Sequence, residues 1–166
     1  MGQSNMEWLS LYTMQKQLDA YIEAQHDLSG RDLFKEKYLA LLVELGELAN
    51  ETRCFKFWSV KPRSDQSVIL EEYVDGIHFI LSLGLEKGCR YVSEIIKPAK
   101  MDESGQFNRV YDLCSAFYRE PTEENYNKLF ESYLQLGALL GFDAQGVKDA
   151  YLKKNEINYE RQNEGY

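Results

Sequence analysis

Residues 39–49 read LALLVELGELA, and this stretch decides the fold class of the chain. As a helix it is apolar on almost every side except at Glu44 and Glu47. A helix turns about 100° per residue, so these two acids lie about 60° apart, with Leu41 and Leu48 beside them. The stretch therefore predicts a helix that presents two carboxylates toward a protein interior.

The same arrangement occurs a second time along the chain. Glu72 and Asp75 are again three residues apart, and apolar residues share their sector of a helix: Val68, Ile69, Phe79 and Leu83. Two helices joined by a modest loop can pack antiparallel, which would point the two acidic pairs at each other. We therefore expect an all-α helical bundle whose antiparallel central helices carry a metal site.

Apolar spacing and capping residues predict the remaining helices. The expected ranges are 7–27, 32 to about 52, 65 or 67 to about 87, a short helix at 91–96, then 106–119, 121–140 and 143 to about 162, with Pro121 suited to a first helical position. No segment shows the sustained alternation of a strand. A length of 166 residues is typical of one domain, so we expect residues 1–166 to form a single all-α domain.

Composition limits the partners of the chain. Hydrophobic residues make up 44% and charged residues 28%, as in globular proteins. A net charge of −8 argues against binding nucleic acid or an anionic membrane, so a polyanionic ligand must bring cations with it. The longest uncharged stretch, 132–142, is too short to span a bilayer, and the N-terminus has no targeting pattern. We expect a soluble, cytoplasmic protein.

Buried carboxylates need compensation. Their burial costs several kcal/mol each, so they must be protonated, paired with Lys or Arg, or bound to metal. Four carboxylates around one cavity suit Mg²⁺, with Mn²⁺ as a substitute, and two or more such ions can neutralise phosphate oxygens and activate water. The pattern indicates metal-assisted phosphoanhydride hydrolysis. A solvated acidic stripe, or pairing with basic residues of another helix, is the alternative.

The C-terminal segment offers the matching cations. Lys154, Asn158 and Arg161 fall at positions i, i+4 and i+7 and so share one helical face. Arg can grip a phosphate with two hydrogen bonds, Lys supplies a compact charge, and Asn can bond a phosphate oxygen or a sugar hydroxyl. The trio fits a phosphate site, although basic residues near a chain terminus also commonly form a solvated face.

Four segments carry a family resemblance: MQKQLD at 14–19, ELGELANETRCFKFW at 44–58, EEYVDGIHF at 71–79, and KKNEINYERQNEGY at 153–166. In order and spacing they resemble the dimeric, all-α dUTPase family, whose relatives are the MazG-like nucleoside triphosphate pyrophosphohydrolases. The likeness covers most of the chain and is weakest over 91–142. It implies a homodimer that hydrolyses dUTP, and dUDP as well, to dUMP, with pyrophosphate released from dUTP.

The resemblance also implies roles for individual residues. Glu44, Glu47, Glu72 and Asp75 take the metal-ligand positions, with water attacking the β-phosphorus and Glu44, or alternatively Glu47, as the catalytic base. Lys154, Asn158 and Arg161 match phosphate-binding positions. Gln15, Trp58, His78 and Phe79 match positions on the nucleoside side, where the two aromatic residues could equally be core and His78 a structural histidine.

Two departures and two alternatives accompany this reading. Asp19 stands where some relatives carry Asn, and the chain is short between the third and last motifs. A metal-dependent hydrolase of dCTP, or of nucleoside triphosphates in general, would use the same carboxylates. A non-enzymatic helical module that binds another protein through its acidic surface is the remaining alternative.

Overall fold

The computed structural model describes residues 4–92 and 96–166 of the chain. It contains six helices: α1 (Ser4–Gln25), α2 (Phe34–Thr52), α3 (Gln66–Lys87), α4 (Glu103–Arg119), α5 (Glu123–Leu139) and α6 (Ala144–Asn163). No strand occurs within the described ranges, which confirms the predicted all-α class. None of the helices there has both the length and the apolar character needed to cross a membrane.

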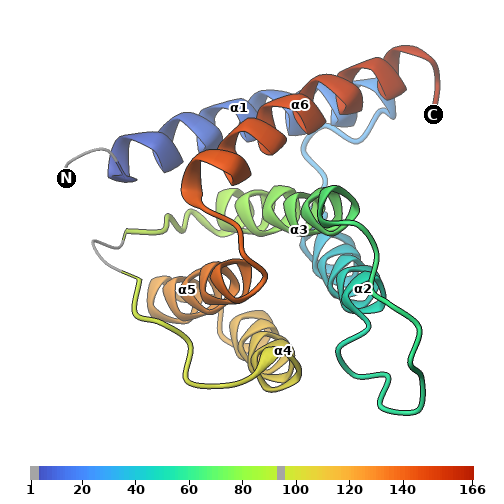
Figure 1. Cartoon of the computed structure of the whole chain (residues 1–166). Helices are drawn as coiled ribbons and strands as arrows, with labels where there is room; N and C mark the ends of the chain where they lie inside the picture. Colours follow the sequence, from blue (N-terminus) through green and yellow to red (C-terminus); the bar gives the residue numbers. More distant parts are fainter. Residues whose placement is uncertain (1–3, 93–95) are drawn as a thin grey trace.

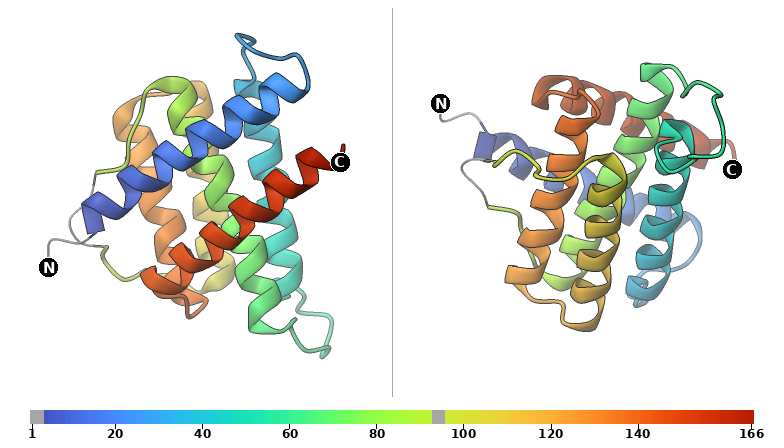
Figure 2. Two further views of the ribbon diagram at one scale, coloured as in Figure 1. Left: turned by 90° about the horizontal axis from the view of Figure 1, so that it is seen from above. Right: turned by 60° about the horizontal axis from the view of Figure 1, so that its bottom comes forward.

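The helices form two layers. In Figure 1, α1 and α6 lie side by side across the top of the other four helices. The two views of Figure 2 show α2 and α3 adjacent and running in opposite directions, with α4 and α5 beside them. α3 is central, because it contacts α1, α2, α5 and α6. Side chains from both layers can therefore meet around it.

Local signals set most helix ends close to the predicted positions. Asp143 caps α6 by accepting a hydrogen bond from the backbone N–H of Gly146 at 2.7 Å, and Gly141, with φ of 90°, ends the preceding turn. Pro121 was expected as the first residue of a helix, which is wrong by two residues. The hydroxyl of Thr122 accepts from the N–H of Asn125 at 3.2 Å, so α5 begins after this cap, at Glu123.

The short helix expected over 91–96 is not observed where the structure describes this stretch. Tyr91, Val92 and Ile96 are not helical, and residues 93–95 lie outside the described ranges. The backbone N–H of Tyr91 donates to the Tyr12 hydroxyl at 2.9 Å, and that of Val92 donates to Asn127 Oδ1 at 2.9 Å. Bonds to side chains of α1 and α5 thus replace the helical pattern.

Two stacked tyrosines hold α3 against α5. The rings of Tyr73 and Tyr133 are 4.5 Å apart and nearly parallel, and the hydroxyl of each donates to the backbone carbonyl of the other. Gly76 and Gly137 make room for them, since a Cβ at either glycine would come within 2.4 Å of a tyrosine hydroxyl. This close contact fixes the helix that carries Glu72 and Asp75.

Candidate active site

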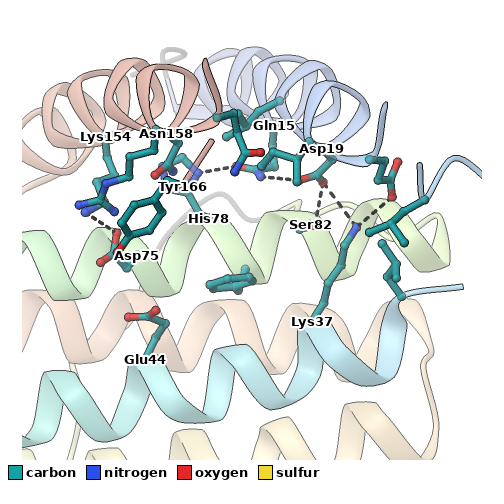
Figure 3. Close-up of a pocket in the computed structure, with 18 residues that line it drawn as sticks. Gln15, Asp19, Lys37, Glu44, Asp75, His78, Ser82, Lys154, Asn158 and Tyr166 are labelled. Carbon is teal, nitrogen blue, oxygen red and sulfur yellow. Dashed lines mark hydrogen bonds and ion pairs between the residues drawn. The ribbon is translucent and has the colours of Figure 1, made fainter. Parts of the chain in front are cut away.

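Three of the four predicted metal ligands come together between α2 and α3. Glu44, Glu72 and Asp75 each offer a carboxylate oxygen, and these oxygens all lie within 4.8 Å of one another. Figure 3 shows Glu44 on α2 below Asp75 on α3. Because antiparallel packing aligns the two acidic pairs, Glu44 joins Glu72 and Asp75 in this three-carboxylate cluster, although it lies 28 and 31 positions before them in the sequence.

The cluster carries negative charge that the protein does not fully compensate. Burial, followed by the charges of Asp75 and Glu47, raises the pKa of Glu44 to about 8 and that of Glu72 to about 7. One oxygen of each glutamate, Oε2, is buried and has no hydrogen-bond partner in the described part of the chain. Oxygens of this kind, crowded and without donors, fit a divalent cation.

Glu47, the fourth predicted ligand, lies at the edge of the cluster. Its side chain is exposed, and it is not among the three residues whose oxygens converge. Its carboxylate nevertheless lies close enough to Glu44 and Glu72 to raise the pKa of both through charge and hydrogen bonding. Glu47 therefore adjoins the cluster from the solvent side.

A lysine from α6 reaches the same carboxylates. Lys154 is buried, and its Nζ lies 3.3 Å from Asp75 and 3.0 Å from Glu71 (Figure 3). Burial lowers the pKa of Lys154, but the two acids raise it more, so its ammonium form is stabilised. Pairing with a basic residue of another helix, the alternative to metal binding, thus applies to Asp75. Glu71 is exposed, yet it shares this lysine.

One cavity of about 340 Å³ joins most of the predicted site residues. Those along its wall are Glu44, Asp75, Lys154, Asn158, Arg161, Gln15, His78 and Phe79. The wall of this cavity therefore combines carboxylates, the basic residues Lys154 and Arg161, and the polar side chains of Gln15 and His78.

Trp58, like Glu47 and Glu72, is a predicted site residue that is not among those lining this cavity. It lies in the loop between α2 and α3, is 64% exposed, and packs edge-to-face against Phe57. Within one chain it therefore does not contribute to the wall of this cavity. The position of Trp58 in a sequence motif did not show that it lies away from the cavity, because that depends on the path of the loop between α2 and α3.

The cavity also contains a polar network around Asp19, of which the sequence indicated only Gln15 as a site residue. Asp19 accepts hydrogen bonds from Gln15 at 2.8 Å and from Ser82 at 2.7 Å, and Lys37 Nζ lies 3.8 Å from its carboxylate. Asp19 and Gln15 are four residues apart on α1, so their shared helix face was a signal available in the sequence. Ser82 and Lys37 come from α3 and α2, and no local pattern links them.

Comparison with known proteins gives the family of the chain. The family model described as dUTPase matches residues 7–166, which is nearly the whole chain. No curated protein matches the chain significantly. The matched range includes both acidic pairs, the C-terminal basic face and Gln15. The chain belongs to the dUTPase family and is a dUTP diphosphatase, a nucleoside triphosphate pyrophosphohydrolase.

Proposed function

We propose that the chain hydrolyses dUTP to dUMP and pyrophosphate, and dUDP to dUMP, at the cavity between the two helix layers, with Mg²⁺ as its cofactor. Family membership supports the reaction. The observation that carries the site assignment is that Glu44 and Asp75 share one cavity with Lys154, Asn158, Arg161 and Gln15. One cavity would thus bind the phosphates, neutralise their charge and recognise the base.

The residues that would hold the cation are Glu44, Glu72 and Asp75, with Glu47 as the fourth ligand. The unpartnered, buried oxygens of Glu44 and Glu72 fit this role, because hard carboxylate oxygens are the preferred ligands of Mg²⁺ and Mn²⁺. Two or more ions would offset much of the negative charge of four acids and a triphosphate. Cations held there supply charge that neutralises phosphate oxygens and makes a nearby water more acidic.

Glu44 is placed to accept the proton of the attacking water. Glu44 lines the cavity and has a buried carboxylate oxygen without a partner among the described residues, so it could accept this proton from a water within hydrogen-bond reach. Water oxygen would bond to the β-phosphorus while the bond between that phosphorus and the α-β bridging oxygen breaks. The bridging oxygen leaves with dUMP. Glu47, exposed beside Glu44, is the alternative base.

Lys154, Asn158 and Arg161 would hold the phosphates. All three line the cavity from α6. Lys154 lies 3.3 Å from Asp75, and its attraction to this carboxylate would weaken if Asp75 held a cation. The ammonium group of Lys154 would then be free to turn to a phosphate oxygen. Gln15, His78 and Phe79 would contact the nucleoside.

A homodimer would cover an exposed apolar surface that the single chain leaves open. Leu39 and Val43 on α2 are 61% and 51% exposed, and Phe57, Trp58 and Val60 in the following loop are more so. Large apolar patches commonly mark a protein interface. We place the enzyme in the cytoplasm, where its three free cysteines, Cys54, Cys89 and Cys114, would stay reduced.

A nucleotide panel tests the proposal. Purified protein is incubated with dUTP, dUDP, dCTP and dTTP, with Mg²⁺, with Mn²⁺ and with chelator. We expect Mg²⁺-dependent dUMP formation, at least a hundredfold slower in Glu44→Gln. Glu36→Gln, an exposed acid at the start of the same helix, serves as the matched control. If dUTP stays intact while another nucleotide is hydrolysed, the assignment of dUTP as substrate is wrong. Binding of a protein partner without any nucleotide turnover would favour the non-enzymatic alternative.

A further inference from the structure

The ammonium group of Lys154 lies between two acids of α3. Glu71 and Asp75 are four residues apart, so they share one face of this helix, and both reach Lys154 on α6. The Nζ of Lys154 is 3.0 Å from Oε1 of Glu71, to which it donates a hydrogen bond, and 3.3 Å from Oδ1 of Asp75 (Figure 3). Lys154 is 7% exposed. A single buried ammonium group is thus shared by two carboxylates.

Lys154 lies in the wall between two cavities. The first is the cavity of the candidate active site, which Asp75 also lines. The second has a volume of about 330 Å³, and Glu71 lines it together with apolar residues such as Val68 and Ile157. Glu71 is not among the residues that line the first cavity, and Asp75 is not among those that line the second. Glu71 therefore binds the ammonium group from outside the space that a nucleotide would fill.

The two acids differ in what else they can bind. Asp75 belongs to the three-carboxylate cluster that would hold the cation, whereas Glu71 is not one of its three members. The side chain of Asp75 is 19% exposed, and that of Glu71 is 55% exposed. A cation and a phosphate would engage Asp75 and Lys154 from the first cavity, on the side away from Glu71. The hydrogen bond to Glu71 is therefore the one that can persist when a nucleotide is bound.

The ammonium group of Lys154 has enough donors for both partners. It carries three N–H bonds in tetrahedral directions, at the end of a long and flexible side chain. When Glu71 accepts one of these bonds on the outer side, the other two diverge from it and remain available to Asp75 and to a ligand in the first cavity. A side chain that is already ordered before the ligand arrives loses less entropy on binding. The contact with Glu71 can thus favour binding without any contact between Glu71 and the ligand.

We infer that Glu71 is a positioning residue for phosphate binding: it holds the ammonium group of Lys154 at the wall of the first cavity and leaves its other N–H donors for the phosphates. The inference rests on the proposed function and adds a residue that touches neither substrate nor cation. It also fixes the sign of an effect. If Glu71 only competed with the phosphates for Lys154, removing its carboxylate would strengthen nucleotide binding, whereas the loss of a positioning contact weakens it.

The test is the Kd of α,β-imido-dUTP, an analogue with nitrogen in place of the α-β bridging oxygen, measured by calorimetry with Mg²⁺. We expect Glu71→Ala to raise this Kd roughly three- to fivefold, the range for a half-exposed ion pair, with kcat for dUTP largely retained. Glu71→Gln keeps an acceptor oxygen and should recover most of the loss. Glu124→Ala is the matched control, since Glu124 pairs with Lys128 at 3.1 Å and neither lines the first cavity. An unchanged or lower Kd in Glu71→Ala would overturn the inference.

A double-mutant comparison separates positioning from a general structural effect. In a Lys154→Ala background, Glu71→Ala should leave the Kd of the analogue unchanged, because no ammonium group remains to be held. A general loss of structure would instead weaken binding by the same factor in both backgrounds. That equal loss would overturn the inference.

A further measurement needs no nucleotide. In an Asp75→Ala background, where Glu71 is the remaining acid beside Lys154, ¹⁵N relaxation of the lysine Nζ reports the order of the ammonium group. Its signal is assigned by its absence in Lys154→Ala. We expect an ordered ammonium group in Asp75→Ala and a mobile one when Glu71→Ala is added; equal order in both would overturn the inference. Failure of wild type to hydrolyse dUTP would refute the proposed function instead, and the relaxation data would still show whether Glu71 holds Lys154.

Discussion

The ammonium group of Lys154 lies 3.3 Å from a carboxylate oxygen of Asp75, and this pair joins the two halves of the site. Asp75 belongs to the three-carboxylate cluster on α2 and α3, whereas Lys154 belongs to the basic face of α6. The lysine supplies positive charge to a cluster whose other members, Glu44 and Glu72, have oxygens without partners.

Lys154→Ala should raise KM for dUTP at least tenfold, because the phosphates lose a cation. It should also destabilise the metal-free protein by about 1–3 kcal/mol, because the partly buried Asp75 loses a charged hydrogen-bond partner. Steady-state kinetics and denaturant unfolding in chelator measure the two effects. Lys153→Ala, an exposed neighbour on α6, is the control and should change neither quantity. Wild-type KM in Lys154→Ala would contradict the phosphate role.

Mg²⁺ should raise the melting temperature. The carboxylates of the cluster are crowded, and burial and their mutual repulsion raise the pKa values of Glu44 and Glu72. A cation that binds only the folded state relieves this repulsion. It stabilises the fold by about 2.7 kcal/mol when its concentration is a hundred times its Kd. For a chain of this size we expect roughly 5–10 °C by thermal unfolding at pH 8. Glu72→Gln should show a smaller increase, and the same melting temperature with Mg²⁺ and with chelator would count against a metal cluster.

His78 should make stability depend on pH on the acidic side of neutrality. Its folded pKa is about 3 and its unfolded pKa 6.5, so between these values the unfolded chain binds one more proton. Stability is then fully present above pH 6.5 and falls as pH decreases, by up to about 1.4 kcal/mol per unit. Denaturant unfolding from pH 7 to 5 should show a shallower dependence in His78→Gln than in wild type. His26→Gln, at an exposed position, should retain the wild-type slope.

Two glycine-to-alanine changes should have opposite effects. At Gly137 a Cβ would lie 2.4 Å from the hydroxyl of Tyr73, so Gly137→Ala should destabilise the fold by about 1–3 kcal/mol through overpacking. At Gly46 the nearest atom is 3.6 Å away, an ordinary contact, so Gly46→Ala should be neutral or stabilising by about 0.5–1 kcal/mol. Free energies of unfolding measure both. A tolerated Gly137→Ala would show that α3 and α5 can separate without cost.

The sequence predicted the parts of this protein that depend on local spacing. The apolar stretch 39–49 and the caps along the chain predicted helices that the structure confirms to within a few residues at most ends. The i, i+3 spacing of Glu44 with Glu47, and of Glu72 with Asp75, predicted acids on inward faces, and three of the four converge. Helical periodicity repeats every few residues, so a short window is sufficient to read it.

Only the tertiary structure decided which distant residues meet. Sequence spacing did not show that Lys154 would pair with Glu71 as well as Asp75, or that Ser82 and Lys37 would converge on Asp19. It also predicted a helix at 91–96, where bonds from α1 and α5 hold the described backbone in another conformation. Such contacts depend on how whole helices pack, because that packing, and not the neighbouring sequence, determines which side chains come within hydrogen-bond distance.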